Sequence, residues 1–159
     1  MVSSPEDLDE EDRLDVAAER VNLERALDAR NLLRDGLASL EWLPDGRLTS
    51  LQRKLRTSNF HIFHFIGHGG YDEDREESVL LLEDDDHRSL AVGGVDLGMC
   101  LRDDPQLRLV VLNACEAGRT SETDPFSGVA TTLVEDQIPA VIAMQFEITD
   151  AAAITFGSA

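Results

Sequence analysis

Three short, largely apolar runs recur along the chain, at 60–66, 108–112 and 140–144. Each is shorter than an ordinary buried helix, and polar or glycine-containing segments bound each of them. Apolar residues at nearly every position, rather than at alternate positions, are typical of a strand that is buried on both faces. The three runs therefore predict three strands of a parallel sheet.

Amphipathic segments lie between and around these runs. Apolar residues at helical spacing predict helices over 13–35, 48–55, 94–102, from 125 onward and from 150 onward. Asp124 and Pro125 form a helix-start signal, an N-cap carboxylate followed by proline. Gly36 is placed to end the first helix.

Shorter patterns add to this picture. Alternation predicts a further strand at 38–43, and apolar runs at 79–82 and 89–92 flank an acidic turn and predict a hairpin. Strands that alternate with helices predict an α/β fold. We expect a three-layer sandwich with a mostly parallel sheet and helices on both faces.

The chemistry-bearing residues follow two of the predicted strands. The first strand ends in Gly-His-Gly-Gly at 67–70, and the second ends in Asn-Ala-Cys-Glu-Ala-Gly at 113–118. If these strands are neighbours, His68 and Cys115 emerge at the same edge of the sheet, where α/β proteins place their sites. An adjacent imidazole activates a thiol, and glycine amides can hold an oxyanion. A buried cysteine and a hydrogen-bonded histidine in turns are the structural alternative.

Charge limits the possible partners. The 159 residues include 32 acidic and 14 basic side chains, for a formal charge of −18. Such a chain repels phosphate backbones and anionic membranes, so we expect no nucleic acid and no membrane partner, and basic peptides are favoured. Two cysteines do not form a disulfide framework, which favours the cytoplasm. No apolar run approaches the roughly 20 residues of a membrane span.

Other candidate sites are weaker. His61 and His64 point to opposite faces of a strand, so no metal site is expected. The glycines at 67–70 lack the Lys-Ser/Thr of a phosphate-binding loop, and no cofactor is expected. Nine carboxylates and one arginine occupy 72–86. Asp72, Glu73 and Glu116 are candidate rim residues of a cleft, or solvated surface residues.

The exact amino-acid sequences of the two strand-end segments are more informative than the spacing of His68 and Cys115. FHFIGHG at 63–69 and VVLNACEAG at 110–118 resemble the CHAT domain family, and the likeness continues through PFSGVA at 125–130 and IPAVIAMQF at 138–146. The resemblance covers roughly residues 14–159. It implies the caspase-like fold of clan CD cysteine peptidases.

The same resemblance implies roles for individual residues. His68 matches the family's catalytic histidine and Cys115 its nucleophile, acting as a dyad without a third member. The backbone N–H groups of Gly69 and Cys115 match the oxyanion hole. The implied activity is that of a cysteine endopeptidase, which such families often couple to TPR or other sensor modules.

The chain also departs from the family pattern. Residues 1–12 form an acidic segment whose first five residues resemble the end of a first strand that is otherwise missing, and the final helix stops at Ala159. Residues 13–159 are therefore interpreted as a partial CHAT domain. The alternative function is a catalytically inactive remnant that acts as an interaction or regulatory module. A nucleotide-binding domain is a third possibility, but residues 3–5 supply no phosphate-binding glycines.

Overall fold

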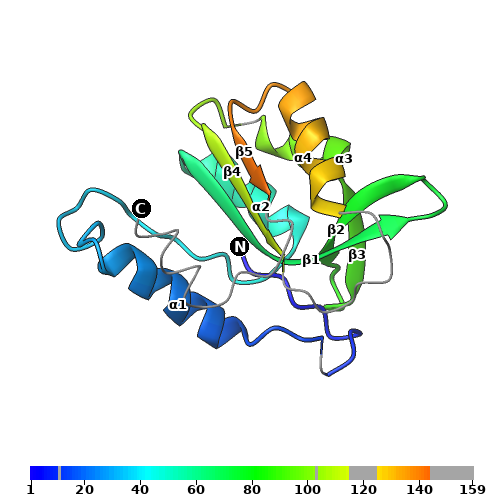
Figure 1. Ribbon diagram of the computed structural model, residues 1–159, viewed down its shortest axis with the longest axis horizontal. Helices are drawn as coiled ribbons and strands as arrows, with labels where there is room; N and C mark the ends of the chain where they lie inside the picture. Colours follow the sequence, from blue (N-terminus) through cyan, green and yellow to red (C-terminus); the bar gives the residue numbers. More distant parts are fainter. Residues whose placement is uncertain (11, 103, 115–124, 144–159) are drawn as a thin grey trace.

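The computed structural model describes residues 1–10, 12–102, 104–114 and 125–143. Within these ranges the chain forms one five-stranded sheet in the order β3-β2-β1-β4-β5 (Figure 1). The strands are β1 (Ile62–Asp72), β2 (Glu77–Glu83), β3 (Ser89–Gly93), β4 (Leu109–Ala114) and β5 (Val141–Ala143). All three strands predicted from the apolar runs, and both strands of the predicted hairpin, are present.

The α/β class is confirmed, but the sheet is mixed rather than mostly parallel. β1 pairs with β4, and β4 with β5, in parallel. β1 with β2, and β2 with β3, are antiparallel. The difference arises because β1 continues past its apolar half as far as Asp72. A short acidic turn then returns the chain alongside it as β2, and antiparallel neighbours need only such a turn.

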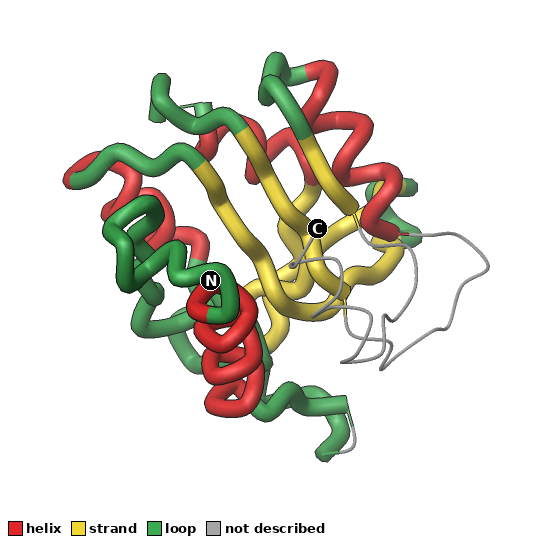
Figure 2. Tube along the Cα trace, turned by 60° about the vertical axis from the view of Figure 1, so that its left-hand side comes forward, coloured by secondary structure: helices red, strands yellow, loops and turns green. Residues whose placement is uncertain are grey.

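The core lies on one face of the sheet, under three helices: α2 (Leu48–Thr57), α3 (Gly94–Leu101) and α4 (Pro125–Glu135) (Figure 2). Each helix adds apolar side chains at i, i+4 spacing, as the sequence predicts. These side chains pack with those of the strands in a single cluster. Its central members are Leu51, Leu55, Phe63, Phe65, Leu97, Leu101, Val110, Leu112, Val129 and Leu133.

The first helix, α1 (Val16–Asp28), lies apart from this core (Figure 1). None of its residues is buried, although Asp15 caps it by accepting a hydrogen bond from the Ala18 N–H at 3.0 Å. It is also shorter than the predicted 13–35. Residues 29–36 form turns instead, so Gly36 does not end the helix. It lies in the last of these turns with a φ of +68°, a conformation that glycine adopts without strain.

The strand predicted at 38–43 is absent, and these residues have no regular structure. Trp42 contacts α1, whereas Glu41 pairs with Lys54 of α2 and Leu43 joins the core. The indole N–H of Trp42 donates to Glu24 Oε1 at 2.9 Å, and the Arg20 guanidinium lies 5.3 Å from the centre of the Trp42 ring. Tertiary contacts have overridden the local alternation.

The N-terminal residues lie beside β1, on the edge opposite β4. Val2 forms a parallel bridge with Ile66, where the Ser3 N–H donates to the Ile66 carbonyl at 2.9 Å and the Ile66 N–H donates to the Met1 carbonyl at 3.0 Å. The prediction that the first residues resemble the end of a strand is therefore consistent with this pairing. No helix in the described ranges is both long enough and apolar enough to cross a bilayer.

Candidate active site

The two strands that carry the predicted site are neighbours. β1 and β4 run in parallel, and their register places Gly67 opposite Ala114. His68 and Cys115 are the next residues of the respective segments. The adjacency on which the sequence argument depended is thus confirmed. Cys115 and Glu116 themselves lie outside the described residues, so their positions are not part of this geometry.

His68 is almost completely enclosed. Its side chain is 2% exposed, and neither ring nitrogen has a hydrogen-bond partner within the described ranges. Burial lowers the pKa of His68, because the charged ring is disfavoured away from water, whereas the nearby Asp12 acts in the opposite direction. The net shift is downward. The ring is therefore neutral at pH 7 and able to accept a proton.

The alternation of β1 explains why His68 faces away from the helices. Phe63 and Phe65 point into the core, so His64, Ile66 and His68 share the opposite face. Gly67 fixes this arrangement next to the histidine. A Cβ at Gly67 would lie 2.3 Å from Cζ of Phe65, so only glycine fits above that ring.

The backbone of Gly69 is also oriented by the alternation. The Ile66 N–H and C=O bond to the N-terminal segment, on the edge of β1 away from β4. Successive residues of a strand direct their N–H groups to alternate edges. The N–H of Gly69, three positions later, is therefore directed toward the side on which β4 lies, as an oxyanion donor beside residue 115 would require.

The acidic candidates lie further along the hairpin. Asp72 is four residues beyond His68, roughly 13 Å along a strand. Its carboxylate accepts from the N–H groups of Asp74 and Arg75 at 3.0 and 3.1 Å, and the Arg75 side chain lies 3.6 Å from it. Glu73 is exposed in the same turn. The structure therefore does not bring Asp72 or Glu73 close to His68.

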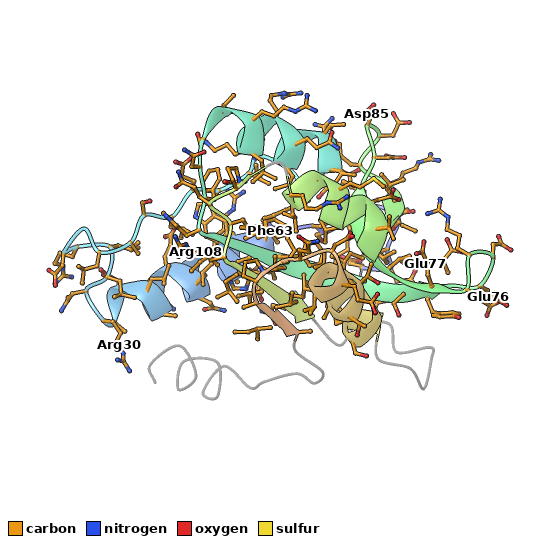
Figure 3. The ribbon with its side chains drawn as sticks, turned by 90° about the horizontal axis from the view of Figure 1, so that it is seen from above. Arg30, Phe63, Glu76, Glu77, Asp85 and Arg108 are labelled. Atoms are coloured by element: carbon orange, nitrogen blue, oxygen red, sulfur yellow. The ribbon has the colours of Figure 1, made fainter. Side chains whose placement is uncertain are left out.

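The outer end of the hairpin is also acidic. Figure 3 shows Glu76 at the projecting tip, whereas Glu77 lies further in, with its carboxylate beside Gly93 of β3. Among the residues that the structure describes, Arg75 offsets these charges locally, at 3.7 Å from Glu77. The tip of the hairpin is thus a projecting anionic element, distant from the buried His68.

One residue near the site was not identified from the sequence. Asp12 belongs to the acidic segment before α1, which the sequence predicts to be solvated. It nevertheless acts to raise the pKa of His68, 56 positions later in the chain. His64, on the same face of β1, was identified only as a strand histidine. Burial, and secondarily the Met1 ammonium, lower its pKa to about 4. Neither effect leaves a local signal in the sequence.

His68 is buried at the end of the parallel pairing of β1 with β4, and β4 leads directly into Cys115 in the sequence. The comparison with known families defines the class of protein. The family model for the CHAT domain matches residues 2–159. The chain therefore belongs to the CHAT domain family, which is caspase-like and related to cysteine peptidases. A search of curated proteins finds no match.

Proposed function

We propose that the chain is a cysteine endopeptidase domain in which Cys115 is the nucleophile and His68 its acid-base partner. The observation that supports this most directly is the buried His68 ring, whose two nitrogens lack partners among the described residues. Buried polar groups are normally hydrogen-bonded, and exceptions concentrate where a group is reserved for chemistry. The ring also lies where the parallel pairing of β1 with β4 ends, at the edge of the sheet where α/β proteins place their sites.

Chain connectivity adds to this argument. Cys115 is bonded to Ala114, and consecutive Cα atoms are about 3.8 Å apart. Ala114 is the registered partner of Gly67, which is bonded to His68. If this register continued by one residue, Cys115 would lie opposite His68, as the activation of a cysteine by a histidine requires.

The proposed reaction begins with transfer of the Cys115 thiol proton to neutral His68. The thiolate sulfur attacks the peptide carbonyl carbon, forming a C–S bond, while the N–H groups of Gly69 and Cys115 donate to the developing oxyanion. The imidazolium gives its proton to the leaving nitrogen as the C–N bond breaks. Water then attacks the thioester, losing a proton to His68. Finally the C–S bond breaks, and the proton from His68 returns to the sulfur.

The charge distribution favours a basic substrate. The −18 formal charge and the projecting acidic hairpin would attract lysine- or arginine-rich peptides by long-range electrostatics. Two cysteines do not make a disulfide framework, which favours a reducing compartment such as the cytoplasm. A TPR or similar sensor module acting in trans is the class of regulatory partner that the family suggests.

The test is the pH dependence of Cys115 alkylation by iodoacetamide, measured with Cys100→Ala as the background so that a single thiol is followed. We expect an apparent pKa below the ordinary thiol value of about 8.5, and a return to that value in His68→Ala. His61→Ala is the matched control, because His61 is exposed at the start of the same segment.

If Cys115 titrates as an ordinary thiol with and without His68, the dyad is not formed. The domain would then be an inactive member of the family that serves as an interaction module. If the dyad is present, cleavage of a peptide library that varies in charge measures the proposed preference for basic residues.

A further inference from the structure

His68 lies at a fork in the sheet. Val2 forms a parallel bridge with Ile66, whereas His68 pairs with Leu81 of β2. The edge of β1 opposite β4 therefore changes partner just before the histidine. Ser3 joins both branches of the fork, because its N–H donates to the Ile66 carbonyl at 2.9 Å and its hydroxyl donates to the Leu81 carbonyl at 2.8 Å. Whatever holds Ser3 in place thus also holds the backbone next to His68 on two strands.

Glu83 and His87 fasten residues 3–7, which we call the strap. The Ser4 N–H donates to Oε1 of Glu83 at 3.3 Å, and the Glu6 N–H donates to the carbonyl of His87 at 2.7 Å. The two fastening residues also contact each other, since Nδ1 of His87 lies 2.9 Å from Oε2 of Glu83. One carboxylate thus contacts the strap with one oxygen and an ionisable ring with the other. The protonation state of His87 is therefore coupled to the strap.

The rest of the strap is also packed against the protein. Ser3 is fully buried, and Oδ1 of Asp7 accepts from the N–H and the hydroxyl of Ser89 at 2.7 and 2.8 Å. The Ser4–Glu83 bond, at 3.3 Å, is longer than the ordinary range of N–H···O bonds. It is therefore the attachment that gains most when Glu83 is fixed in place.

The charges around His87 favour its protonated form. Those on the strap, on β2, before α2 and in the histidine's own turn are Glu6, Glu83, Arg47, Asp84, Asp85, Asp86 and Arg88. The hydrogen bond to Glu83 contributes most, and Glu6 acts in the same direction, whereas Arg47 opposes them. The net effect raises the pKa of His87 above its ordinary value. The charged ring is therefore present in mild acid and is lost as the pH rises through the raised pKa.

We propose that the Glu83–His87 pair is a pH-sensitive clamp, which holds the strap more firmly when His87 is protonated. A protonated ring binds the carboxylate more strongly, because charge-assisted hydrogen bonds are roughly twice as strong as neutral ones. The carboxylate is then fixed beside the strap, and the fork next to His68 is held with it. The clamp itself is independent of the proposed peptidase function, and only its consequence for catalysis by His68 rests on that function.

The test is amide hydrogen exchange of the strap, compared between the parent protein and His87→Asn at pH 5.5 and again at pH 8.5. Comparing two proteins at one pH cancels the intrinsic effect of pH on exchange, and asparagine suits the positive φ of 59° at this position. At pH 5.5 the strap of the variant should exchange roughly two- to fivefold faster, the range that an exposed charge pair supports. At pH 8.5 the two proteins should approach each other. Asp86→Asn, which removes a charge from the same exposed turn, is the matched control and should leave exchange unchanged.

The same ratio at both pH values would overturn the proposal, because the proton on His87 would then not affect the strap. So would an equal change in Asp86→Asn, or faster exchange in β4 with an unchanged strap. Glu83→Gln is a second variant, which keeps an acceptor oxygen for the Ser4 N–H but loses the charge, and its strap should exchange with no such pH dependence. Exchange does not involve Cys115, so failure of the clamp and failure of the peptidase function, tested by alkylation, are distinguished.

Discussion

The ring of Phe65 fills the space in which Gly67 would carry a side chain. A Cβ at Gly67 would lie 2.3 Å from Cζ and 2.8 Å from Cε1 of that ring. Phe65 is fully buried in the core, so the ring cannot move aside cheaply. The glycine before His68 is therefore required by packing on the opposite face of the sheet, in addition to any role at the site.

Gly67→Ala should destabilise the protein by about 1–3 kcal/mol, the usual cost of overpacking a core. The displaced strand should also reduce the reactivity of Cys115 toward iodoacetamide. Chemical denaturation measures the first effect and alkylation the second. Gly70→Ala is the matched control on the same strand, because its Cβ would meet Val79 Cγ2 at an ordinary 3.8 Å. Equal losses in the two variants would contradict the packing explanation.

The lowered pKa of the buried His64 predicts that the folded protein loses stability in acid. Burial and the Met1 ammonium lower its pKa from 6.5 to about 4 in the folded protein. The unfolded chain therefore binds a proton first, and stability falls as the pH drops from about 6.5 toward 4. A shift of this size corresponds to about 3 kcal/mol at the acid end.

His64→Gln removes this titration without introducing a charge. Its unfolding free energy should depend less on pH between about 6.5 and 4 than that of the parent protein. Denaturant titrations at several pH values measure the slope, and His61→Gln serves as the exposed control. Parallel pH profiles for parent and His64→Gln would show that His64 is not the residue responsible.

His87 should have the opposite effect, so that its contribution to stability is lost as the pH rises. Its Nδ1 lies 2.9 Å from Oε2 of the buried Glu83, and this carboxylate raises the pKa of His87. The stabilising pair is complete below the unfolded pKa of about 6.5 and is lost as the pH rises through the higher folded value.

His87→Asn tests this pair while suiting the positive φ of 59° at that position. The variant should be less stable than the parent near pH 5.5 and should approach it near pH 8.5, as measured by denaturation at both values. A difference that is the same at both pH values would mean that the proton on His87 contributes nothing.

The apolar runs were sufficient to predict the strands that form the site. The continuous run at 108–112 predicts a strand buried on both faces, and it leaves open whether that strand adjoins the first one. β4 does lie beside β1 inside the sheet, but Val110 and Leu112 are buried whereas Leu109 and Val111 on the other face are only half-buried. The alternation at 38–43 misled because Trp42 binds Glu24 of α1, a contact that no local pattern records. The antiparallel pairing of β2 with β1 arises because β1 extends as far as Asp72, and the apolar pattern does not show where that strand ends. Asp12 was unrecognisable for a related reason, since a carboxylate in an acidic run carries no sign of what it faces.

The attachment of the first residues has a consequence for the order in which the chain folds. Ser3 Oγ donates to the Leu81 carbonyl, the Ser4 N–H donates to Glu83, and both the N–H and hydroxyl of Ser89 donate to Asp7, over sequence separations of 78 to 82 residues. Closing loops of this length costs more chain entropy than forming the β1–β2–β3 hairpins, whose partners are close in sequence. We therefore expect the hairpins to form first and the N-terminal residues to join the completed sheet last. Because Ser3 bonds to Ile66, two residues before His68, the surroundings of His68 would be among the final parts of the fold to assemble.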